Sequence, residues 1–340
     1  MDKAIMIGID TAKNVFEVHG RNAAGEVVLR RRLKRAQVEK FFADHPKALI
    51  GMEACGSAHY WGRLLERLGH EVRLMPPSYV KPYIKRNKND GRDAAGCCEA
   101  VSRPDMRFVR IKTAEQQASL SLHRSRQLLV RQRTQLGNAF RSLLAEFGVV
   151  AAKGREGLAK LATDLRAGVL ELPAAACTAA LALADQRANL VPAIKELERQ
   201  IAEQAKAEPR AKMLQTAPGV GPMTAHATLA TVPDPAMFKS GRDFAAWIGL
   251  TPRESSSGGK QRLGSITRQG DQTLRRLLVL GATAWLRQVE THPEKASPWL
   301  RKMMARKPKK VVAVAQAART ARILWAMLTH NQPYRAPASA

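Results

Sequence analysis

Short apolar runs alternate with segments of helical periodicity along the first third of the chain. Runs of strand length bounded by turn residues, with amphipathic segments between the later ones, predict an α/β domain. The first three strands are joined by tight turns and must be antiparallel, whereas the later strands, separated by helices, can run parallel. This mixed order is the layout of RNase H-like domains, although a fold alone assigns no function. The predicted strands are residues 4–9, 15–19, 27–31, 48–52 and 72–75, and the predicted helices are residues 38–44, 59–68 and one that begins at Asp90.

The middle of the chain has a different pattern, which is long, charged and helical. Residues 113–147 carry an apolar stripe of leucines, and residues 181–203 form a second long stretch rich in Ala and Leu. Two such helices, separated by residues 148–173, can pair as an antiparallel hairpin, which would act as a dimerising arm or as a structural spacer. Pro192 predicts a kink in the second helix or marks its true start.

Two glycines mark a turn between two apolar helices in residues 214–232. Pro218 presets the entry to this turn, and Gly219 and Gly221 lie within it. A Gly-x-Gly turn before a helix N-terminus presents bare backbone N–H groups, which favour the binding of DNA phosphate. The pattern is that of a helix-hairpin-helix, with an ordinary helical turn as the alternative. We therefore predict that both glycines contact nucleic acid.

Residues 255–270 have almost no apolar periodicity and are dense in Ser, Gly, Lys and Arg. Such a stretch is either disordered or a functional loop on a rigid base. Amphipathic helices are predicted at residues 274–289 and 311–328, with a basic connector at residues 301–310 between them. The patterns divide the chain into an α/β RNase H-like domain (residues 1–110), a long helical coiled-coil-like segment (residues 111–206) and a mainly α domain with the helix-hairpin-helix (residues 207–335).

Charge narrows the choice of partners. Lys and Arg total 56 against 29 Asp and Glu, which gives a formal net charge of +27. A surplus of this size repels itself unless a polyanion offsets it, and nucleic acid is the natural partner. An anionic membrane is the competing partner, but the longest apolar stretches are far shorter than a spanning helix and no signal peptide precedes the first strand. Because only 5% of the residues are aromatic, backbone contacts from Lys and Arg should outweigh base stacking.

The cysteines indicate no metal site of their own. Cys55, Cys97, Cys98 and Cys177 show no paired CxxC spacing, so neither a zinc site nor a disulfide framework is predicted. A reducing cytosol fits this usage, and we expect a cytoplasmic protein without a membrane partner.

Four acidic residues fall where they could share a metal. Asp10 and Glu53 each end an apolar run that is predicted to be a central strand, and burying a carboxylate there is costly unless a cation balances it. Asp90 and Asp93 lie three apart at the start of a helix, so both project from one face. Four acids brought together would repel one another unless divalent metal intervened, and Mg²⁺ suits a few carboxylates plus phosphate oxygens. Two ions roughly 3.5–4 Å apart can activate an attacking oxygen and stabilise the leaving one.

Each acid also has a simpler interpretation. An Asp after a strand is usually a turn or cap residue, and acids in the first turn of a helix suit its dipole. The metal site is favoured because all four acids fall at appropriate places in one fold order. The strongly basic segment around the second pair adds predicted nucleic-acid contacts at Lys85, Arg86, Lys88 and Arg92.

Several of these segments resemble the motifs of a known family. IGIDTAK (residues 7–13), GMEACG (51–56) and NKNDGRDA (87–94) resemble the Asp-Glu-Asp-Asp motifs of bacterial insertion-sequence transposases of group one-hundred-and-ten. The N-terminal domain of these transposases is similar to the RuvC Holliday-junction resolvase. In the second half, TAPGVGPMTA and the stretch that begins FAAWIGLTPRESSSGG resemble the family's C-terminal transposase domain. The match spans most of the chain, and the joint presence of both motif sets is highly specific.

The resemblance implies a recombinase that is guided by a structured non-coding RNA of the element, called a bridge or seeker RNA, which pairs with donor and target double-stranded DNA. It implies that the four acids hold Mg²⁺, for which Mn²⁺ can substitute, near the scissile phosphate. It also implies that a serine attacks and forms a phosphoserine link to DNA, so that strands can be resealed without ATP. The implied assembly is a homo-oligomer, a dimer or a tetramer, with serine and carboxylates from different subunits, and the implied location is the bacterial nucleoid when active.

The serine carries over with two candidates. The family serine precedes a Gly in the loop after Leu-Thr-Pro-Arg, and Ser257 matches this Ser-Gly pair and is favoured. Counting back from the Ile-Thr-Arg sequence that follows chooses Ser256 instead. Nearby cations suit attack on phosphate and are predicted to contact nucleic acid: Lys260, Arg262 and Arg268.

Two other functions stay open. A hydrolytic endonuclease of the junction-resolvase type would use the same acids with water as the nucleophile, but it needs neither Ser257 nor a C-terminal domain of this size. A basic nucleic-acid binding or packaging protein would need no catalysis. The substitution Asp10→Asn should abolish activity in both enzymes and leave a binding protein intact.

Overall fold

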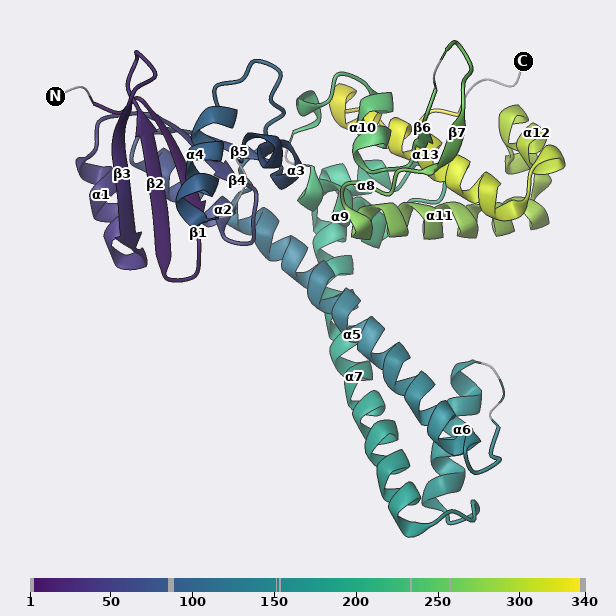
Figure 1. Ribbon diagram of the computed structural model, residues 1–340. Helices are drawn as coiled ribbons and strands as arrows, with labels where there is room; N and C mark the ends of the chain where they lie inside the picture. The colour runs from purple at the N-terminus through teal and green to yellow at the C-terminus, as the bar shows by residue number, and fades with distance from the viewer. Residues whose placement is uncertain are drawn as a thin grey trace. The chain divides into compact units, whose positions relative to one another are not determined.

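The computed structural model describes residues 3–84, 89–150, 152, 154–232, 234–256 and 258–336. The chain forms two compact units, Met1–Gln117 and Ala118–Ala340, called here the first and the second unit (Figure 1). The first unit is a mixed sheet with helices, and the second unit is mainly helical.

The sheet of the first unit has the strand order β3-β2-β1-β4-β5. Strand β1 pairs antiparallel with β2 and parallel with β4, while β2–β3 is antiparallel and β4–β5 is parallel, which confirms the predicted mixed order. Its elements are β1 (Met6–Thr11), β2 (Val15–Arg21), β3 (Val27–Lys34), η1 (Arg35–Gln37), α1 (Val38–Asp44), β4 (Leu49–Glu53), α2 (Ala58–Arg67), β5 (Glu71–Met75), α3 (Pro77–Val80), η2 (Lys81–Tyr83) and α4 (Asp90–Ala100).

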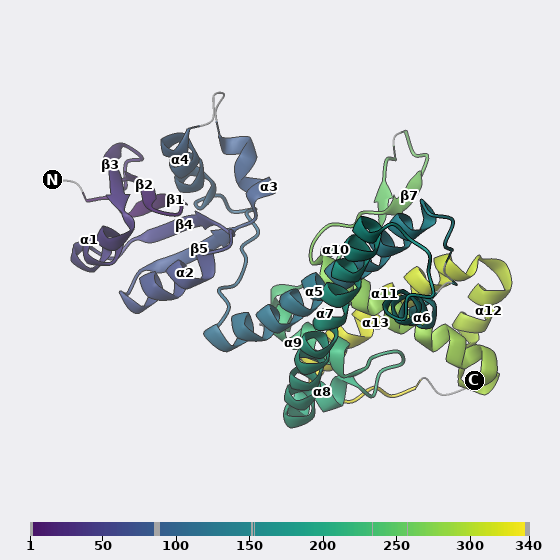
Figure 2. The same ribbon diagram turned by 90° about the horizontal axis from the view of Figure 1, so that it is seen from below.

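Helices cover both faces of this sheet (Figure 2). Helices α1 and α2 share one core with the strands, in which Ile7, Phe16 and Ile50 are almost fully buried. Helix α4 packs against β1, β2 and β4 on the other face, where Cys97 and Met75 are buried. Because side chains alternate along a strand, the residues of β1 that point away from the first core point toward α4.

Two glycines let α4 lie directly on the strands. Gly8 and Gly51 are register partners in β1 and β4. A Cβ atom on Gly8 would lie 2.0 Å from the carbonyl oxygen of Ala94, and one on Gly51 would lie 2.9 Å from that of Cys97. Each glycine precedes a predicted metal ligand by two residues, so the acid points to the same face of the sheet. The close approach of α4 therefore brings its first turn to the acids.

The second unit begins with a long helical arm. Helix α5 (Ala114–Ala145), whose first residues belong to the first unit, and helix α7 (Ala174–Ala207) are joined by an Arg126–Glu198 ion pair and, with α6 (Arg155–Arg166), share a small core around Phe140 (Figure 1). The sequence did not indicate α6. The prediction that Pro192 marks the start of the second helix is wrong, because α7 begins at Ala174 and continues through the proline. The supercoiled packing of a coiled coil stays a prediction.

The rest of the second unit is globular, with a core around Phe244, Leu278 and Leu324. Residues 255–270, predicted as a loop or a disordered stretch, contain part of a β-hairpin, and the basic connector contains a helix. The elements are α8 (Pro209–Leu214), α9 (Pro222–Thr231), η3 (Pro235–Met237), α10 (Gly241–Trp247), β6 (Pro252–Glu254), β7 (Leu263–Ile266), α11 (Gln272–Thr291), η4 (Pro293–Lys295), α12 (Pro298–Arg306) and α13 (Lys309–His330).

Among the described residues, one helix is long and apolar enough to cross a membrane, contrary to the expectation that every apolar stretch is too short. Helix α13 has 22 residues, and half of its most apolar 18-residue stretch is buried. Ala317, Ala321 and Leu324 on this helix are fully buried in the core of the second unit. We therefore interpret α13 as a core helix.

A buried histidine pair joins three helices of the second unit. Nε2 of His123 on α5 lies 2.8 Å from Nδ1 of His226 on α9, and Nε2 of His226 lies 2.9 Å from Oε1 of Gln204 on α7. Burial, followed by the charges of His226 and Arg126, lowers the pKa of His123 to about 4, and burial also lowers the pKa of His226. Both rings are therefore neutral at pH 7. The N–H of His123 can then be donated to His226, and the N–H of His226 to Gln204.

Replacing Gly8 with Ala should destabilise the first unit by about 1–3 kcal/mol, because the added methyl group meets backbone atoms of α4 that can move only with the helix. The free energy of unfolding by urea measures this cost. Gly56→Ala is the matched control, since a Cβ at Gly56 would meet no atom within 4 Å among the described residues. Equal stability of the two variants would contradict this account of the packing of α4.

The histidine pair predicts acid sensitivity of the second unit. The pKa of His123 is lowered from 6.5 to about 4 in the folded chain, so the unfolded chain binds a proton first as the pH falls. Stability should be complete above about pH 6.5 and decrease from there toward pH 4, by up to about 1.4 kcal/mol per pH unit for each histidine. Urea unfolding of the wild type and of His123→Gln across this range measures it. The exposed His330 offers the control His330→Gln, which should keep the wild-type slope.

Candidate active site

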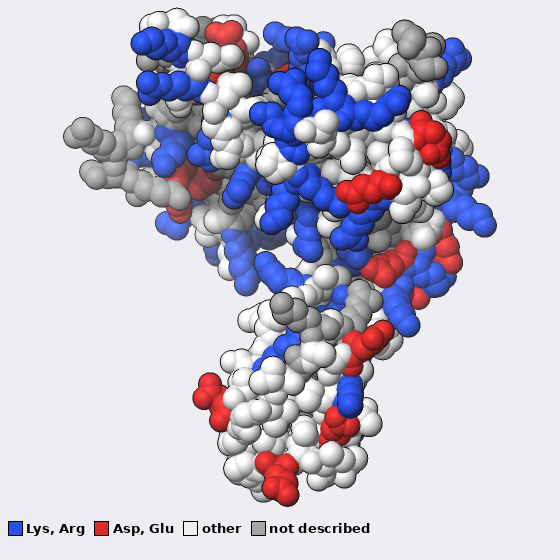
Figure 3. Space-filling view, turned by 90° about the vertical axis from the view of Figure 1, so that its right-hand side faces the viewer, with Lys and Arg blue, Asp and Glu red and all other residues white. Residues whose placement is uncertain are grey.

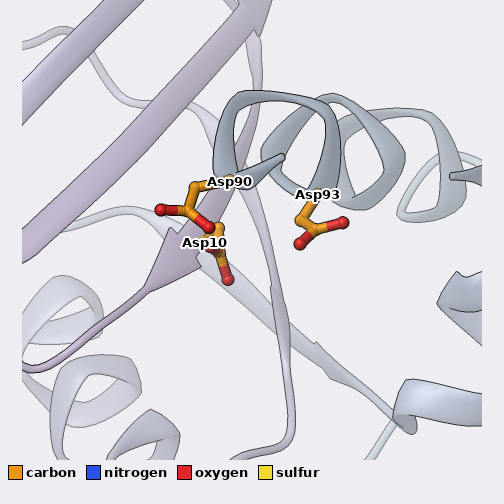
Figure 4. A group of neighbouring side chains, drawn as sticks. All are labelled: Asp10, Asp90 and Asp93. Atoms are coloured by element: carbon orange, nitrogen blue, oxygen red, sulfur yellow. The ribbon is translucent and has the colours of Figure 1, made fainter. Parts of the chain in front are cut away.

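Three carboxylates meet where α4 begins. One oxygen from each of Asp10, Asp90 and Asp93 lies within 4.8 Å of the other two. Asp10 comes from β1, and the two other residues come from the first turn of α4, all on the same side of the sheet (Figure 4). The sequence placed Asp10 after its strand, but β1 extends to Thr11, so Asp10 lies within the strand. It pairs with Glu17 of β2, while the pairing of β1 with β4 ends one residue earlier, at Ile9.

The cap of α4 is provided by a different residue. Asn89 is the N-cap, and its Oδ1 accepts the backbone N–H of Arg92 at 3.2 Å. The interpretation of Asp90 and Asp93 as capping residues is therefore not needed, although both suit the positive end of the helix dipole. This leaves both carboxylates turned toward Asp10 (Figure 4).

Asp93 is the buried member of the group, with 7% of its surface exposed. Its Oδ1 is buried and has no hydrogen-bond partner among the residues that the structure describes. A buried carboxylate oxygen without a donor is costly, and two more carboxylates beside it add repulsion. Hard divalent cations such as Mg²⁺ bind carboxylate oxygens and remove both costs, so this donor set fits a divalent cation.

Glu53 is not part of this close group. It is the last residue of β4, and since Ile9 pairs with Met52, it lies beside Asp10 on the face toward α4. The parallel register therefore places Glu53 and Asp10 at neighbouring positions, and the orientation of the longer Glu53 side chain sets its distance from the other acids. Ligation by Glu53 stays a prediction.

Cys97 lies behind the acids and was not predicted as part of the site. Burial raises the pKa of its thiol, and the negative charges of Glu53, Asp10 and Asp93 raise it further. The thiol is therefore neutral at pH 7 and adds no charge under the carboxylates.

The predicted serine loop is the tip of the β6–β7 hairpin in the second unit. Ser257 lies outside the described residues. Oγ of Ser256 donates a hydrogen bond to Oε1 of Glu254 at 2.8 Å and accepts one from the backbone N–H of Arg262 at 3.2 Å. Both hydrogen-bonding functions of the Ser256 hydroxyl are thus used within the hairpin.

The base of this hairpin is held by Arg275 of α11, which the sequence did not indicate. Its Nη1 donates to the carbonyl oxygens of Ile248 at 2.7 Å and Gln269 at 2.5 Å, on either side of the hairpin. Gly249 and Gly270 have φ angles of 78° and 68°, which favour glycine, and lie against the opposite backbone. The serine loop therefore stands on a fixed base.

The seven basic residues that were predicted to contact nucleic acid fall into two groups. Lys85, Arg86 and Lys88 lie outside the described residues. The exposed side chains are those of Arg92, Lys260, Arg262 and Arg268.

The two glycines of the predicted helix-hairpin-helix have different surroundings. Gly219, with a φ of 74°, packs against α11, where a Cβ would lie 2.6 Å from the carbonyl oxygen of Gly281. Gly221 is the N-cap of α9, and no described atom lies within 4 Å of its Cβ position. Gly219 therefore allows the close packing of the turn on α11, whereas the space beside Gly221 holds no described atom.

Comparison with known proteins connects both halves of the chain to transposases. Residues 7–148 match the family model of the IS110-type DEDD transposase domain, and residues 211–300 match the model described as transposase IS116/IS110/IS902 family. The acids at positions 10, 53, 90 and 93 fall in the first match, and the serine hairpin falls in the second.

Relatives extend over nearly the whole length. A protein of Sinorhizobium fredii named as a transposase, y4pF/y4sB, is 48% identical over 98% of this chain and 87% of its own length. A Pseudomonas aeruginosa protein named as a family 20 transposase is 48% identical over 97% of this chain and 98% of its own. The transposase for insertion sequence element IS1328 of Yersinia enterocolitica is 38% identical, with the same coverage of 97% and 98%.

Replacing Asp93 with Asn tests the metal site. Without divalent metal, the melting temperature of the variant should equal or exceed that of the wild type, because one of three repelling charges is removed. Saturating Mg²⁺ should stabilise the wild type by about 2.7 kcal/mol at a hundred times the dissociation constant and should leave the variant nearly unchanged. Thermal melting with and without Mg²⁺ measures both effects, and Asp105→Asn, at an exposed acid of the same unit, is the control. A wild-type response to Mg²⁺ in Asp93→Asn would contradict the site.

Proposed function

The chain belongs to the IS116/IS110/IS902 family of insertion-sequence transposases, and we propose that it cuts and rejoins DNA with a divalent metal at its acidic site and a serine nucleophile. The family implies DNA cleavage and transfer. The observation that supports the metal most directly is the unpaired buried oxygen of Asp93 beside two further carboxylates. Mg²⁺ is the proposed ion, with Mn²⁺ as a substitute.

The proposed ligands are Asp10, Asp90 and Asp93, with Glu53 as the fourth. A cation at this position supplies charge stabilisation for phosphoryl oxygens. The chain itself orients the ligands: pairing with Glu17 of β2 fixes Asp10, and Asn89 fixes the first turn of α4. Basic residues nearby, such as the exposed Arg92, would bind the neighbouring phosphates of the DNA strand.

Ser257 is the proposed nucleophile. Its Oγ would form a bond to the phosphorus of the scissile phosphate while the bond to the leaving oxygen of the DNA strand breaks. The hydroxyl proton passes to solvent or a nearby base, and the leaving oxygen takes up a proton. The product is a phosphoserine diester, which preserves the energy of the broken bond for resealing.

The hydrogen bonds of Ser256 support this choice between the two serines. Its hydroxyl is used within the hairpin, as a donor to Glu254 and as an acceptor from Arg262. These bonds suit a residue that shapes the tip of the hairpin. A carboxylate within reach of a hydroxyl is also the arrangement of a base and a nucleophile, so Ser256 is the defined alternative.

We further propose that the enzyme acts with an element-encoded RNA and as a homo-oligomer. The net charge of +27 suits the binding of polyanions, and DNA and RNA present the same phosphate backbone to it. Purified protein without RNA should therefore bind DNA with little sequence preference, and addition of the transcript of the element should create the preference.

A covalent adduct tests the nucleophile. Wild-type protein incubated with Mg²⁺, element-end DNA and the element transcript should yield labelled DNA that stays attached to protein in denaturing gels. Ser257→Ala should form none, because the attacking oxygen is absent, while Ser256→Ala should retain adducts at a reduced level. The reverse result would assign the nucleophile to Ser256. DNA nicking without any adduct in the wild type would instead support hydrolysis of the resolvase type.

Asp10→Asn should lower the rate of strand cleavage at least about a hundredfold. Mutation of residues that only support metal ligands already lowers activity or metal affinity by up to about that factor, and Asp10 is a proposed ligand. Binding of DNA should stay within about twofold, because phosphate contacts from Lys and Arg are unchanged. Cleavage rates under single-turnover conditions and a mobility-shift assay give the two values. Normal cleavage by this variant would contradict the proposed metal chemistry.

A further inference from the structure

A groove in the second unit has no role in the function described so far. It encloses about 940 Å³, at the upper end of the roughly 300–1,000 Å³ typical of ligand sites. Its walls are the turn around Gly219, one face of α11, the start of α12 and the C-terminal residues Tyr334 and Ala336. All of these residues belong to the second unit, whereas the acidic site belongs to the first unit.

The floor of the groove is an apolar stripe on α11. The groove-lining residues of this helix recur at helical spacing and therefore share one face. Leu280, on this face, is 55% exposed, and Trp285, which also lines the groove, is partly buried against the core around Leu300. The stripe consists of Leu277, Leu280, Gly281, Ala284, Trp285 and Gln288.

The turn that forms the facing wall lies directly on this helix. A Cβ on Gly281 would lie 2.0 Å from the carbonyl oxygen of Gly219, so the turn and the helix touch through their backbones. Gly221 lines the groove with its side open, as the N-cap of α9. At Gly221 the groove wall is therefore bare backbone, which a flat or extended ligand can approach closely.

Cations border the groove at the start of α12. Lys295 and Arg301 line it, together with one acid, Glu294. The following segment has no acidic residue, and Figure 3 shows Lys and Arg crowded on this side of the globular part, while the end of the arm is mostly uncharged or acidic. The cations from position 295 to 310 are Lys295, Arg301, Lys302, Arg306, Lys307, Lys309 and Lys310.

We propose that this groove binds single-stranded DNA, with bases on Leu280 and Trp285 and phosphates on Lys295 and Arg301. An apolar floor with a cationic border matches a strand whose base faces are exposed, because stacking on an aromatic ring accepts any base while cations follow the backbone. In duplex DNA the base faces are covered by their neighbours, so the floor would have no partner. The proposal rests on DNA being the substrate, and it adds a site that holds a strand after it has been unpaired.

Leu280→Glu tests the floor. The residue is exposed, so the chain should fold, and the carboxylate would meet bases and phosphates. Affinity of the full chain for a labelled oligothymidylate of about fifteen nucleotides should fall about tenfold or more, in line with the loss of base stacking. Val150→Glu adds the same charge at an exposed apolar residue of the arm and should stay within about twofold. Equal affinities of the two variants would overturn the proposal.

Arg301→Ala and Lys302→Ala form a second matched pair. Both residues are exposed cations and adjacent in sequence, but only Arg301 lines the groove. Loss of Arg301 should reduce the salt dependence of single-strand binding by about 0.7 in the log–log slope, the value of one phosphate contact. Loss of Lys302 should leave the slope unchanged. An effect of the same size in both would show a diffuse basic surface and contradict the groove.

Crosslinking locates the strand directly. An oligothymidylate with one 5-iodouracil, irradiated on the full chain, should attach to the peptide that contains Trp285. Attachment only elsewhere, or tight binding of oligouridylate with none of oligothymidylate, would overturn the proposal. A change of oligomeric state in Leu280→Glu with unchanged DNA binding would assign the groove to a second copy instead. Cleavage by the wild type and its loss in Asp10→Asn are measured separately, so failure of the groove would leave the proposed function intact.

Discussion

Repulsion among three carboxylates is the constraint on which the rest of the first unit depends. Asp10, Asp90 and Asp93 are held within 4.8 Å of one another, and one of them is buried with an unpaired oxygen. Such a group does not assemble by attraction between its members. It is imposed by the sheet and by α4, whose close packing on Gly8 and Gly51 overrides the repulsion. The repulsion and the unpaired oxygen lower the stability of the fold, and a bound divalent cation would remove both effects.

In the second unit, polar groups are presented on a rigid base. In its serine hairpin the described residues of β6 and β7 are exposed except Ile266, which packs against the core, and Arg275 and two glycines with positive φ fix the base. Its groove combines an apolar helix face with cations, and its charge is concentrated away from the end of the arm (Figure 3). In the proposed function, the first unit binds the metal and the second unit binds the DNA strand.

Much of the first unit could be predicted from sequence, because its strands are apolar runs and its helices are amphipathic. The four acids could be proposed for the same reason, because each falls near an end of a predicted strand or helix. Other features escaped because they depend on contacts between distant residues. The β6–β7 hairpin has no apolar alternation and is defined by Gly249, Gly270 and Arg275, while the distance of Glu53 from the other acids depends on a side-chain orientation that no pattern encodes. Helix α6 was missed although Leu158, Leu161 and Leu165 recur at helical spacing, so it could have been predicted from its apolar pattern.

The central claim is that the acids at β1 and α4 form a divalent metal site. Anomalous X-ray diffraction from crystals of the full chain grown with Mn²⁺ tests it most directly, because manganese is located independently of any model of the protein. The account predicts a strong anomalous peak in contact with oxygens of Asp10, Asp90 and Asp93. Mn²⁺ at saturating concentration with no peak at these residues, or with peaks only at other acids, would contradict it.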